Sequence, residues 1–362
     1  MPLPGRAETH GCKRPSGTQR FDQQRRKSMR HLILGGGPAG IAAAKTIRKR
    51  KKDAAIVIAT EETADPYLRP LLPDLISGDT EISALTDPQG EDLETERIEL
   101  RKGKRAERLD ASENVVYFTD GTEEGYDFLL IATGGKPVLP DPLKKPLRSI
   151  LPFDSLADAL RIKGRAARPG VSIVYGPGYL AIEACRVLRK AGQDVTWLKP
   201  GEPRFGNPIT GEFEASVINE IQHRGVVLKD GDEVESVTET DEETVLVRTT
   251  SGEEIRCRMI VAATERHPCT KFLEGSGVKV GTGVVVDDYL RTFIGNIYAA
   301  GDCAELYDKA SGESRINFGW RSAIKQGQLA GENMAGERKL YIRKQGDYLW
   351  LLFGTSLLDR SR

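Results

Sequence analysis

The feature that most constrains the fold is a glycine-rich loop in HLILGGGPAGIAAA (31–44), which follows directly on an apolar run. Gly35, Gly37 and Gly40 stand in the spacing Gly-X-Gly-X-X-Gly. In such a loop the first glycine takes a tight turn out of a strand, the second lets a pyrophosphate approach the backbone, and the third lets a helix pack closely. Pro38 suits the first helical position because it has no N–H to leave unpaired. The pattern therefore predicts a strand, a phosphate-binding loop and a helix.

Two further features favour a dinucleotide site over a plain tight turn. The N–H groups of the first helical turn, which includes Ala39, would face an anion together with the positive end of the helix dipole. A second apolar run, 54–59, leads to Glu61, which follows Gly40 at close to the spacing of about 20 residues expected of an acid that binds a ribose hydroxyl. The first part of the chain is thus predicted to bind a dinucleotide.

A buried strand is predicted over 128–132, after a hairpin that begins near residue 113. The strand ends in the small residues Ala132, Thr133 and Gly134. Small residues at the carboxyl end of a buried strand are what the close approach of a cofactor requires.

The same order of elements then repeats. An apolar strand over 171–175 leads into YGPGYLAIE, where Gly176, Gly178 and Ala181 form a second phosphate loop, with alanine in the last place as the fingerprint allows. A hairpin and a strand over 255–263 follow it. Two copies of one dinucleotide fold predict two dinucleotides, and enzymes that hold two usually pass electrons between them. The predicted class is α/β, with two Rossmann-like three-layer (ββα) domains.

Composition is compatible with this interpretation and excludes several others. The length of 362 residues allows two domains, and the balance of 53 basic against 53 acidic residues gives no sign of a nucleic-acid partner. No apolar run approaches the roughly 20 residues of a membrane span. The five cysteines form no close pair, which argues against a disulfide scaffold or a redox dithiol and favours a cytoplasmic setting. His223 and His267 lack ligand-spaced companions, so no metal site is predicted.

Residues 1–28 are predicted to be a disordered basic extension, because scattered apolar residues cannot build a core. The segment also lacks the apolar stretch of a secretory signal. Met29 stands immediately before the first strand and is a candidate natural start; a basic tail that docks a partner is the alternative.

The residues resemble the pyridine nucleotide-disulfide oxidoreductase superfamily of two-dinucleotide-binding flavoproteins, from about Met29 to Ala335. Four signatures carry the resemblance: GGGPAG with Glu61, ATGG at 132–135, the second loop with Glu183, and NIYAAGDCAE at 296–305. The stretch PYLRPLLPDLISG is most similar to the branch that holds NAD(P)H:rubredoxin reductases, ferredoxin reductases of oxygenase systems and the flavin domain of assimilatory nitrite reductase.

This resemblance implies a domain organisation and a reaction. The FAD domain would comprise 29–137 and 267–335, the NAD(P) domain 138–266 would be inserted in it, and 336–362 would be a short remnant of a C-terminal interface domain. Hydride would pass from the nicotinamide of NAD(P)H to the flavin, and electrons would leave to a separate acceptor such as rubredoxin or ferredoxin. The isoalloxazine would carry the chemistry, so no catalytic side chain is implied. A homodimer is expected of the family, but 336–362 is much shorter than the family's interface domain, which weakens that expectation.

The resemblance also implies roles for individual residues. The main chain at Ala106 would meet the adenine, Asp302 beside Gly301 would hold the ribityl chain, and the helix from Trp320 would point its N-terminus at the flavin ring. From its sequence context alone, Arg69 would be interpreted as a solvated arginine. The resemblance instead implies that it lies near the flavin. The full predicted cofactor-binding set is Gly35, Gly37, Pro38, Ala39, Gly40, Glu61, Arg69, Ala106, Ala132, Thr133, Gly134, Gly176, Gly178, Tyr179, Leu180, Glu183, Lys199, Glu265, Gly301, Asp302 and Trp320.

Two residues depart from the family's pattern. Lys199 stands where members selective for NADH usually carry an acid, and because a cation can pair with a 2′-phosphate, this favours NADPH. A solvated lysine beside a loosened site is the alternative. Glu265 occupies a position that is usually glycine and is expected to put bulk and negative charge near the nicotinamide end.

Two other functions stay open. One is a flavoprotein of the sulfide:quinone reductase kind, which would need cysteines flanking the flavin and an amphipathic membrane contact, and neither is evident. The other is an FAD-binding partner subunit that is not an independent enzyme. Cys185 and Cys303 are interpreted as packing residues, and the apolar run 348–358 as a packed strand or a subunit contact.

Overall fold

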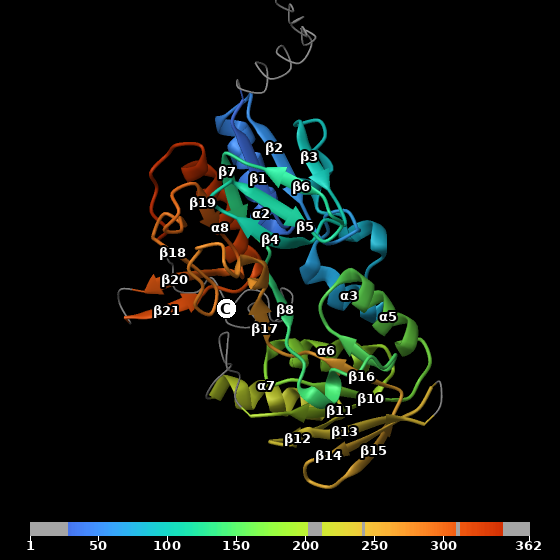
Figure 1. Ribbon diagram of the computed structural model, residues 1–362. Helices are drawn as coiled ribbons and strands as arrows, with labels where there is room; N and C mark the ends of the chain where they lie inside the picture. The colour runs from blue at the N-terminus through green and yellow to red at the C-terminus, as the bar shows by residue number, and fades with distance from the viewer. Residues whose placement is uncertain (1–27, 202–211, 241–242, 309–311, 343–362) are drawn as a thin grey trace, which may run out of the picture.

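The computed structural model describes residues 28–201, 212–240, 243–308 and 312–342. Figure 1 shows two halves, one above the other, each built around a parallel sheet. Most of the predicted extension and the apolar run 348–358 lie outside the described residues. In the described part of the chain, no helix is long and apolar enough to cross a membrane.

The first half contains a parallel sheet in the order β19-β7-β1-β2-β3. Helices α2 and α8 pack together on one face, and the antiparallel sheet β4-β5-β6 lies on the other (Figure 1). A third small sheet, β18-β20-β21, precedes α8. The bounds are β1 Arg30–Leu34, α2 Pro38–Arg50, β2 Ala55–Ala59, β3 Ile98–Arg101, β4 Ala106–Asp110, β5 Val115–Phe118, β6 Glu123–Gly125, β7 Phe128–Ile131, β18 Val284–Val286, β19 Ile297–Ala299, β20 Ala304–Asp308, β21 Glu313–Ile316 and α8 Trp320–Met334.

The second half repeats this plan with the sheet β12-β11-β10-β16-β9. Helices α5, α6 and α7 belong to it, and the antiparallel sheet β13-β14-β15 forms its third layer. The predicted class, two Rossmann-like three-layer units, is confirmed. The bounds are β9 Ile150–Pro152, α5 Leu156–Ala166, β10 Val171–Tyr175, α6 Tyr179–Lys190, β11 Asp194–Lys199, α7 Glu212–His223, β12 Val226–Asp230, β13 Val234–Glu239, β14 Val245–Thr249, β15 Glu254–Cys257 and β16 Met259–Ala262.

One predicted strand is divided. The run 255–263 was expected to be continuous, whereas β15 pairs with β14 and β16 pairs with β10 in a different sheet. Arg258 lies at the break, where its N–H donates to the carbonyl of Val171 at 2.8 Å. A period-two pattern cannot show where a chain passes from one sheet to the next, because both segments are apolar and extended.

Two connecting strands join the halves. Strands β8 (Gly135–Pro137) and β17 (Arg266–Pro268) pair antiparallel and carry the chain into the second half and back. The second half is thereby inserted between two parts of the first. The domain boundaries given above stay a prediction.

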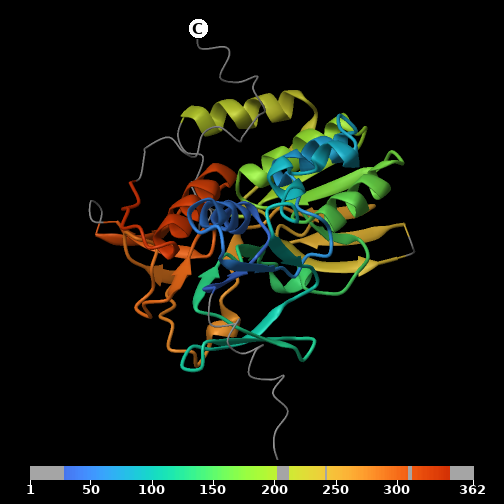
Figure 2. The same cartoon turned by 90° about the horizontal axis from the view of Figure 1, so that it is seen from above.

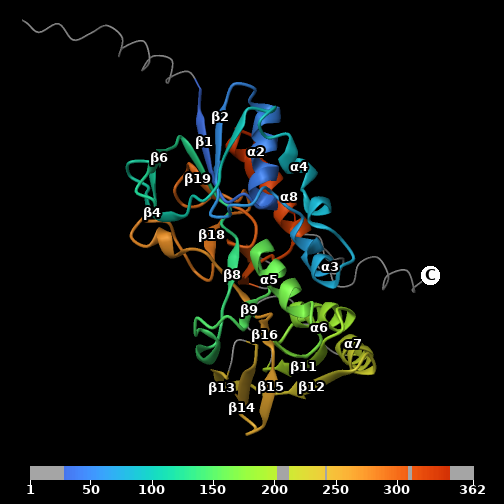
Figure 3. The same cartoon turned by 90° about the vertical axis from the view of Figure 1, so that its right-hand side faces the viewer.

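A helical strap from the first half packs in the core of the second. It comprises η1 (Arg69–Leu71), α3 (Leu72–Ser77) and η2 (Ile82–Leu85). The side chains of Leu75 and Ile76 are buried in the same apolar cluster as α5 and α6. Figure 3 shows α3 beside these two helices. We call residues 67–85 the strap.

Helices α2 and α8 touch through their backbones. A Cβ at Gly327 would lie 2.1 Å from the carbonyl oxygen of Ala39, and one at Gly331 would lie 2.7 Å from that of Ala43. Figure 2 shows the two helices side by side. Only glycine permits this approach, which places the first turn of α2 beside the middle of α8.

Candidate functional site

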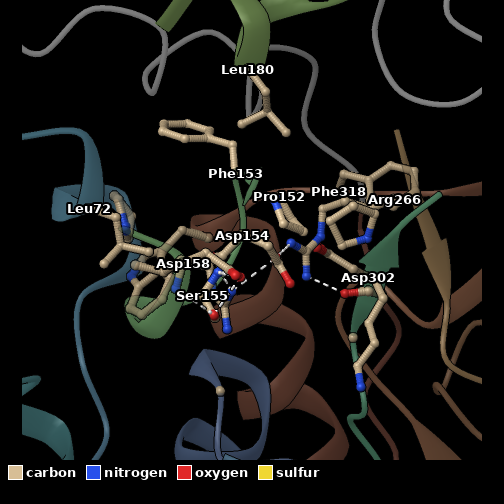
Figure 4. A pocket seen from close by; sticks show the side chains of 18 of the residues that line it. Leu72, Pro152, Phe153, Asp154, Ser155, Asp158, Leu180, Arg266, Asp302 and Phe318 are labelled. Atoms are coloured by element: carbon tan, nitrogen blue, oxygen red, sulfur yellow. Dashed lines mark hydrogen bonds and ion pairs between the residues drawn. The ribbon is translucent and has the colours of Figure 1, made fainter. Parts of the chain in front are cut away.

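A cavity of about 2250 Å³ lies between the two halves. It is lined by the first glycine-rich loop, the ends of β2 and β7, the strap, and the first turns of α5, α6 and α8. Ordinary small-ligand sites measure about 300 to 1,000 Å³, so this cavity is large enough for more than one such ligand. Figure 4 shows part of its wall.

The first loop has the geometry of a phosphate cradle. Gly35 has a φ of +118°, and a Cβ there would lie 2.1 Å from the carbonyl oxygen of Ala132. A Cβ at Gly40 would lie 2.0 Å from the carbonyl oxygen of Gly35, whereas one at Gly37 would meet no protein atom within 4 Å. The outer glycines are therefore required by the protein itself, and the middle one faces open space at the start of α2, where an anion would be bound.

The second loop repeats these relationships. Gly176 has a φ of +156°, and a Cβ there would lie 2.1 Å from the carbonyl oxygen of Ala263. A Cβ at Gly178 would again meet nothing within 4 Å. The first loop lines the cavity, and so do Tyr179 and Leu180, which directly follow Gly178, so both loop–helix junctions border one space.

The predicted ribose acid Glu61 follows β2 and lines the cavity. Its two carboxylate oxygens each accept from Lys136 Nζ at 2.7 Å, and its side chain remains 45% exposed. A hydroxyl can therefore still reach it. Lys136 was not predicted; its place directly after the small residues that end β7 is the signal that could have identified it. Ala106, the predicted adenine contact, also lines the cavity.

Arg69 is not the solvated side chain that its context alone suggests. Its guanidinium lies 2.5 Å from Glu62 Oε1 and 3.1 Å from Asp154 Oδ1, and its Nη1 donates to the carbonyl of Asp154 at 2.6 Å. Arg266, which follows Glu265, forms an ion pair with the same carboxylate. Figure 4 shows Asp154 and Arg266 facing each other in the cavity.

Arg266 is held on two sides. Its Nη2 donates to the carbonyl oxygen of Gly135 on the neighbouring strand, while its Nε has no hydrogen-bond partner. Burial lowers the pKa of the guanidinium, and the charge of Arg69 lowers it further. Neither Asp154 nor Arg266 was predicted, because no short motif links residues so far apart in the chain.

The start of α8 forms another wall. Gly319 caps the helix without a side-chain hydrogen bond, and it lines the cavity together with Trp320. The N–H of Gly319 donates to Asp302 Oδ1 at 3.2 Å. Gly301, the residue before Asp302, donates its N–H to the buried amide oxygen of Gln326 at 2.9 Å. The N-terminus of α8 and the carboxylate of Asp302 therefore lie side by side. The carboxylate can accept from a polar chain of a ligand, and the helix N-terminus can stabilise negative charge on another part of it.

The first turn of α6 supplies Tyr179, Leu180 and Glu183 to the same cavity. Burial raises the pKa of Tyr179 to about 12, and the charge of Asp302 adds to the shift. The carboxylate of Glu183 lies 2.5 Å from Arg186. The second half therefore presents a neutral phenol and a paired carboxylate to the interior.

Lys199 and Glu265 are not among the residues that line this cavity. Lys199 ends β11, is only 6% exposed, and places its Nζ 3.1 Å from Asp230 Oδ1 on β12. Much of its charge is thus neutralised within the sheet. The carbonyl of Glu265 accepts from Val138 at 2.9 Å, in the connection between the halves.

The cysteines differ in their surroundings. Cys303 and Cys185 are buried, and burial raises the pKa of Cys303 to about 11 and that of Cys185 well above its usual value. Cys269 lines the cavity, and its N–H donates to the carbonyl of Gly134 at 3.0 Å. No group of three potential metal ligands is present among the described residues.

Two phosphate cradles of one design, set on duplicated three-layer units around one cavity, define the class of two-dinucleotide-binding oxidoreductases. The pyridine nucleotide-disulphide oxidoreductase family matches residues 29–327, and the chain belongs to this family. The predicted resemblance is confirmed.

Relatives agree with this assignment. The chain is 30% identical over 329 residues to an NADH oxidase of Methanocaldococcus jannaschii, covering 86% of this chain and 72% of the relative. It is 28% identical over 321 residues to an NADH-rubredoxin oxidoreductase of Clostridium acetobutylicum, covering 87% and 77%. Its fold matches the solved structure of a putidaredoxin reductase–putidaredoxin complex with a TM-score of 0.78 at 22% identity, covering 85% and 76%.

Proposed function

We propose that this enzyme is an FAD-dependent NAD(P)H oxidoreductase that delivers electrons to a separate small redox protein. One observation carries the proposal: Gly37 of the first loop and Tyr179, which directly follows Gly178 of the second loop, line a single cavity. Two dinucleotides bound there would have their reactive ends in one enclosed space. The family and the names of its relatives support the same chemistry.

FAD is proposed to occupy the first half. The start of α2 would bind its pyrophosphate, and Glu61 would accept from a ribose hydroxyl. Asp302 would hold the ribityl chain, and the start of α8 would stabilise negative charge on the ring. When bound, FAD supplies the site that accepts hydride and then releases electrons. The remaining residues of the predicted cofactor set in the first half are proposed as contacts along the same path.

The nicotinamide nucleotide is proposed to occupy the second half, with its pyrophosphate at Gly178 and its ring near Tyr179 and Glu183. We propose NADH as the better donor, in place of the NADPH that Lys199 alone favours in the sequence. The ammonium of Lys199 already contacts Asp230, which reduces the positive charge that it can offer to a 2′-phosphate. The names of the two relatives also specify NADH.

The acceptor is proposed to be a small redox protein such as rubredoxin or ferredoxin, because a relative is named for rubredoxin. A second function, that of an FAD-binding partner subunit with no nicotinamide reaction of its own, makes the opposite kinetic prediction. A cytoplasmic location and a homodimer stay predictions.

The test is anaerobic mixing of the FAD-loaded protein with NADH and, separately, NADPH, while flavin absorbance is recorded. Bleaching followed by reoxidation with added rubredoxin or ferredoxin is the expected result. If a nucleotide bleaches the flavin but neither carrier reoxidises it, only the proposal about the acceptor is wrong. Failure of both nucleotides to bleach a flavin that dithionite reduces would overturn the oxidoreductase proposal and leave the partner-subunit function.

A further inference from the structure

We propose that Asp154 is a positioning residue that fixes the second half relative to the first, and thereby sets the donor-to-flavin distance. This inference rests on the proposed function. It concerns how the two halves are held together, whereas the cradles concern how each nucleotide is bound.

Asp154 is the meeting point of two cations from different parts of the fold. It follows β9, the first strand of the second half. Its Oδ1 lies 3.1 Å from Nη1 of Arg69, which belongs to the strap, and forms an ion pair with Nη1 of Arg266, which belongs to the connecting strand β17. Its carbonyl oxygen also accepts from Arg69 at 2.6 Å. Asp154 and Arg266 are labelled in the close view of the cavity (Figure 4).

The ion pairs continue on both sides of Asp154. Arg69 also lies 2.5 Å from Glu62, which directly follows the predicted ribose acid. Arg266 also donates to the carbonyl of Gly135 on the other connecting strand. A continuous series of polar contacts therefore runs from the end of β2, through the strap and Asp154, to both connections between the halves.

How strongly the ion pairs at Asp154 hold depends on how far they are buried. The side chains of Asp154 and Arg266 are 15% and 19% exposed, so water screens their interaction only in part. Two other ion pairs between the strap and α6, Asp79–Lys190 and Asp74–Arg186, are more exposed and contribute less. The strap's own pair with Asp154, through Arg69, is 33% exposed on the arginine and 15% on the carboxylate, whereas Asp74 and Asp79 are 38% and 36% exposed. Asp154 is thus the least exposed of these three carboxylates, and its loss would break the pairs with Arg69 and Arg266 together.

The charges also predict what removal of the carboxylate would do. Arg69 and Arg266 are held together by Asp154, and without its negative charge they would repel each other across the boundary between the halves. The apolar packing of the strap would remain, so the expected result is a shift in orientation rather than loss of the fold. Hydride transfer requires the reacting atoms about 3 to 3.5 Å apart, and a displacement of about 1 Å can lower the rate about a hundredfold.

The test compares Asp154→Asn and Asp154→Glu with the control Asp141→Asn. Asp141 is exposed, pairs with Lys144 and does not line the cavity, so its variant removes the same charge elsewhere in the second half. Each FAD-loaded protein is reduced anaerobically by saturating NADH and, separately, by dithionite. The long-wavelength charge-transfer absorbance of stacked nicotinamide and flavin is recorded, together with backbone amide exchange over 67–77 and 153–158.

For Asp154→Asn we expect reduction by NADH to slow about tenfold to a hundredfold and the charge-transfer absorbance to weaken, with FAD content and dithionite reduction unchanged. Amide exchange in the two segments should quicken about tenfold. Asp154→Glu should recover most of the wild-type rate of reduction by NADH and most of the wild-type protection from amide exchange. Asp141→Asn should match the wild type.

Wild-type NADH reduction and exchange in Asp154→Asn would overturn the proposal. If Asp154→Asn loses FAD or fails to fold, Arg266→Gln breaks the other ion pair of Asp154 at a residue outside the proposed cofactor contacts, and it must show the same slowing and faster exchange, or the proposal fails. If no nicotinamide nucleotide reduces even the wild type, the proposed function fails, and amide exchange alone then decides whether Asp154 holds the halves together.

Discussion

Gly35 lies against the carbonyl group of Ala132, so that a Cβ on residue 35 would be 2.1 Å from its oxygen. A Cβ on Gly37 would meet no protein atom within 4 Å. Gly35→Ala should therefore lower the free energy of unfolding by about 1 to 3 kcal/mol or more, since the backbone at the end of two strands must move. Gly37→Ala should change it by no more than about 0.5 kcal/mol, while lowering FAD affinity. Urea unfolding of the FAD-free proteins and FAD titration measure the two effects.

These two variants are controls for each other, because each adds one methyl group to the same loop. If Gly37→Ala bound FAD as tightly as the wild type, the first loop would not be the site of the pyrophosphate. Equal stability of both variants would mean that the close approach to Ala132 is easily relaxed.

Asp302→Ala should weaken FAD binding by about 1 to 3 kcal/mol, because a partly buried hydrogen-bond acceptor for the ribityl chain is lost. This corresponds to about a fivefold to 150-fold rise in Kd. Asp302→Asn keeps an oxygen that can accept from Gly319 and should lose less. Fluorescence titration of FAD-free protein measures both constants, and unchanged affinity in Asp302→Ala would show that the ribityl chain lies elsewhere.

The contact between Lys199 and Asp230 predicts which nucleotide the enzyme prefers. Asp230→Asn should remove one negative partner of the ammonium, raise the positive charge that it offers to a 2′-phosphate and shift the ratio of kcat/KM towards NADPH, by up to about 1.5 to 3 kcal/mol or roughly tenfold to a hundredfold. Lys199→Gln should leave the wild-type ratio nearly unchanged. A loss of NADPH use in Lys199→Gln would instead show that Lys199 contacts the phosphate despite Asp230.

Thiol labelling should distinguish the cavity cysteine from the buried ones. Cys269 lines the cavity, so it should react with iodoacetamide in FAD-free protein and be protected by FAD. Burial raises its pKa, so less of it is thiolate at neutral pH and its labelling should quicken as pH rises. Cys185 and Cys303 should react only after unfolding. Peptide mass spectrometry gives each rate, and labelling of Cys269 that ignores FAD would place the flavin away from this wall.

The local parts of the site could be predicted from the sequence because their physics is local. The roles of Gly35 and Gly40 follow from a turn and a helix start that are adjacent in the chain, and the structure confirms the close approach at both. Pro38 begins α2 as its missing N–H suggests. The spacing from Gly40 to Glu61 is that of one βαβ unit, which predicts that Glu61 lies beside the first loop. Glu61 lines the same cavity as that loop.

Partners that are distant in the chain could not be predicted. Lys199 was interpreted from its place after a strand, but its charge is paired by Asp230 on the next strand, which only the register of β11 and β12 reveals. Asp154 and Arg266 lie more than one hundred residues apart in sequence and meet only because β8 and β17 bring the chain back to its starting point. No periodicity encodes such a contact.

The strap has a consequence for recombination between members of this family. The hydrophobic interior of the second half is encoded in two separate pieces of the gene, because Leu72, Leu75, Ile76 and Leu85 complete it from within the sequence of the first half. A chimaera that exchanges only the inserted module would leave the donor's helices facing a foreign α3. Swaps that carry residues 67–85 along with the insertion keep this interior intact, so the natural unit of exchange is larger than the contiguous insertion.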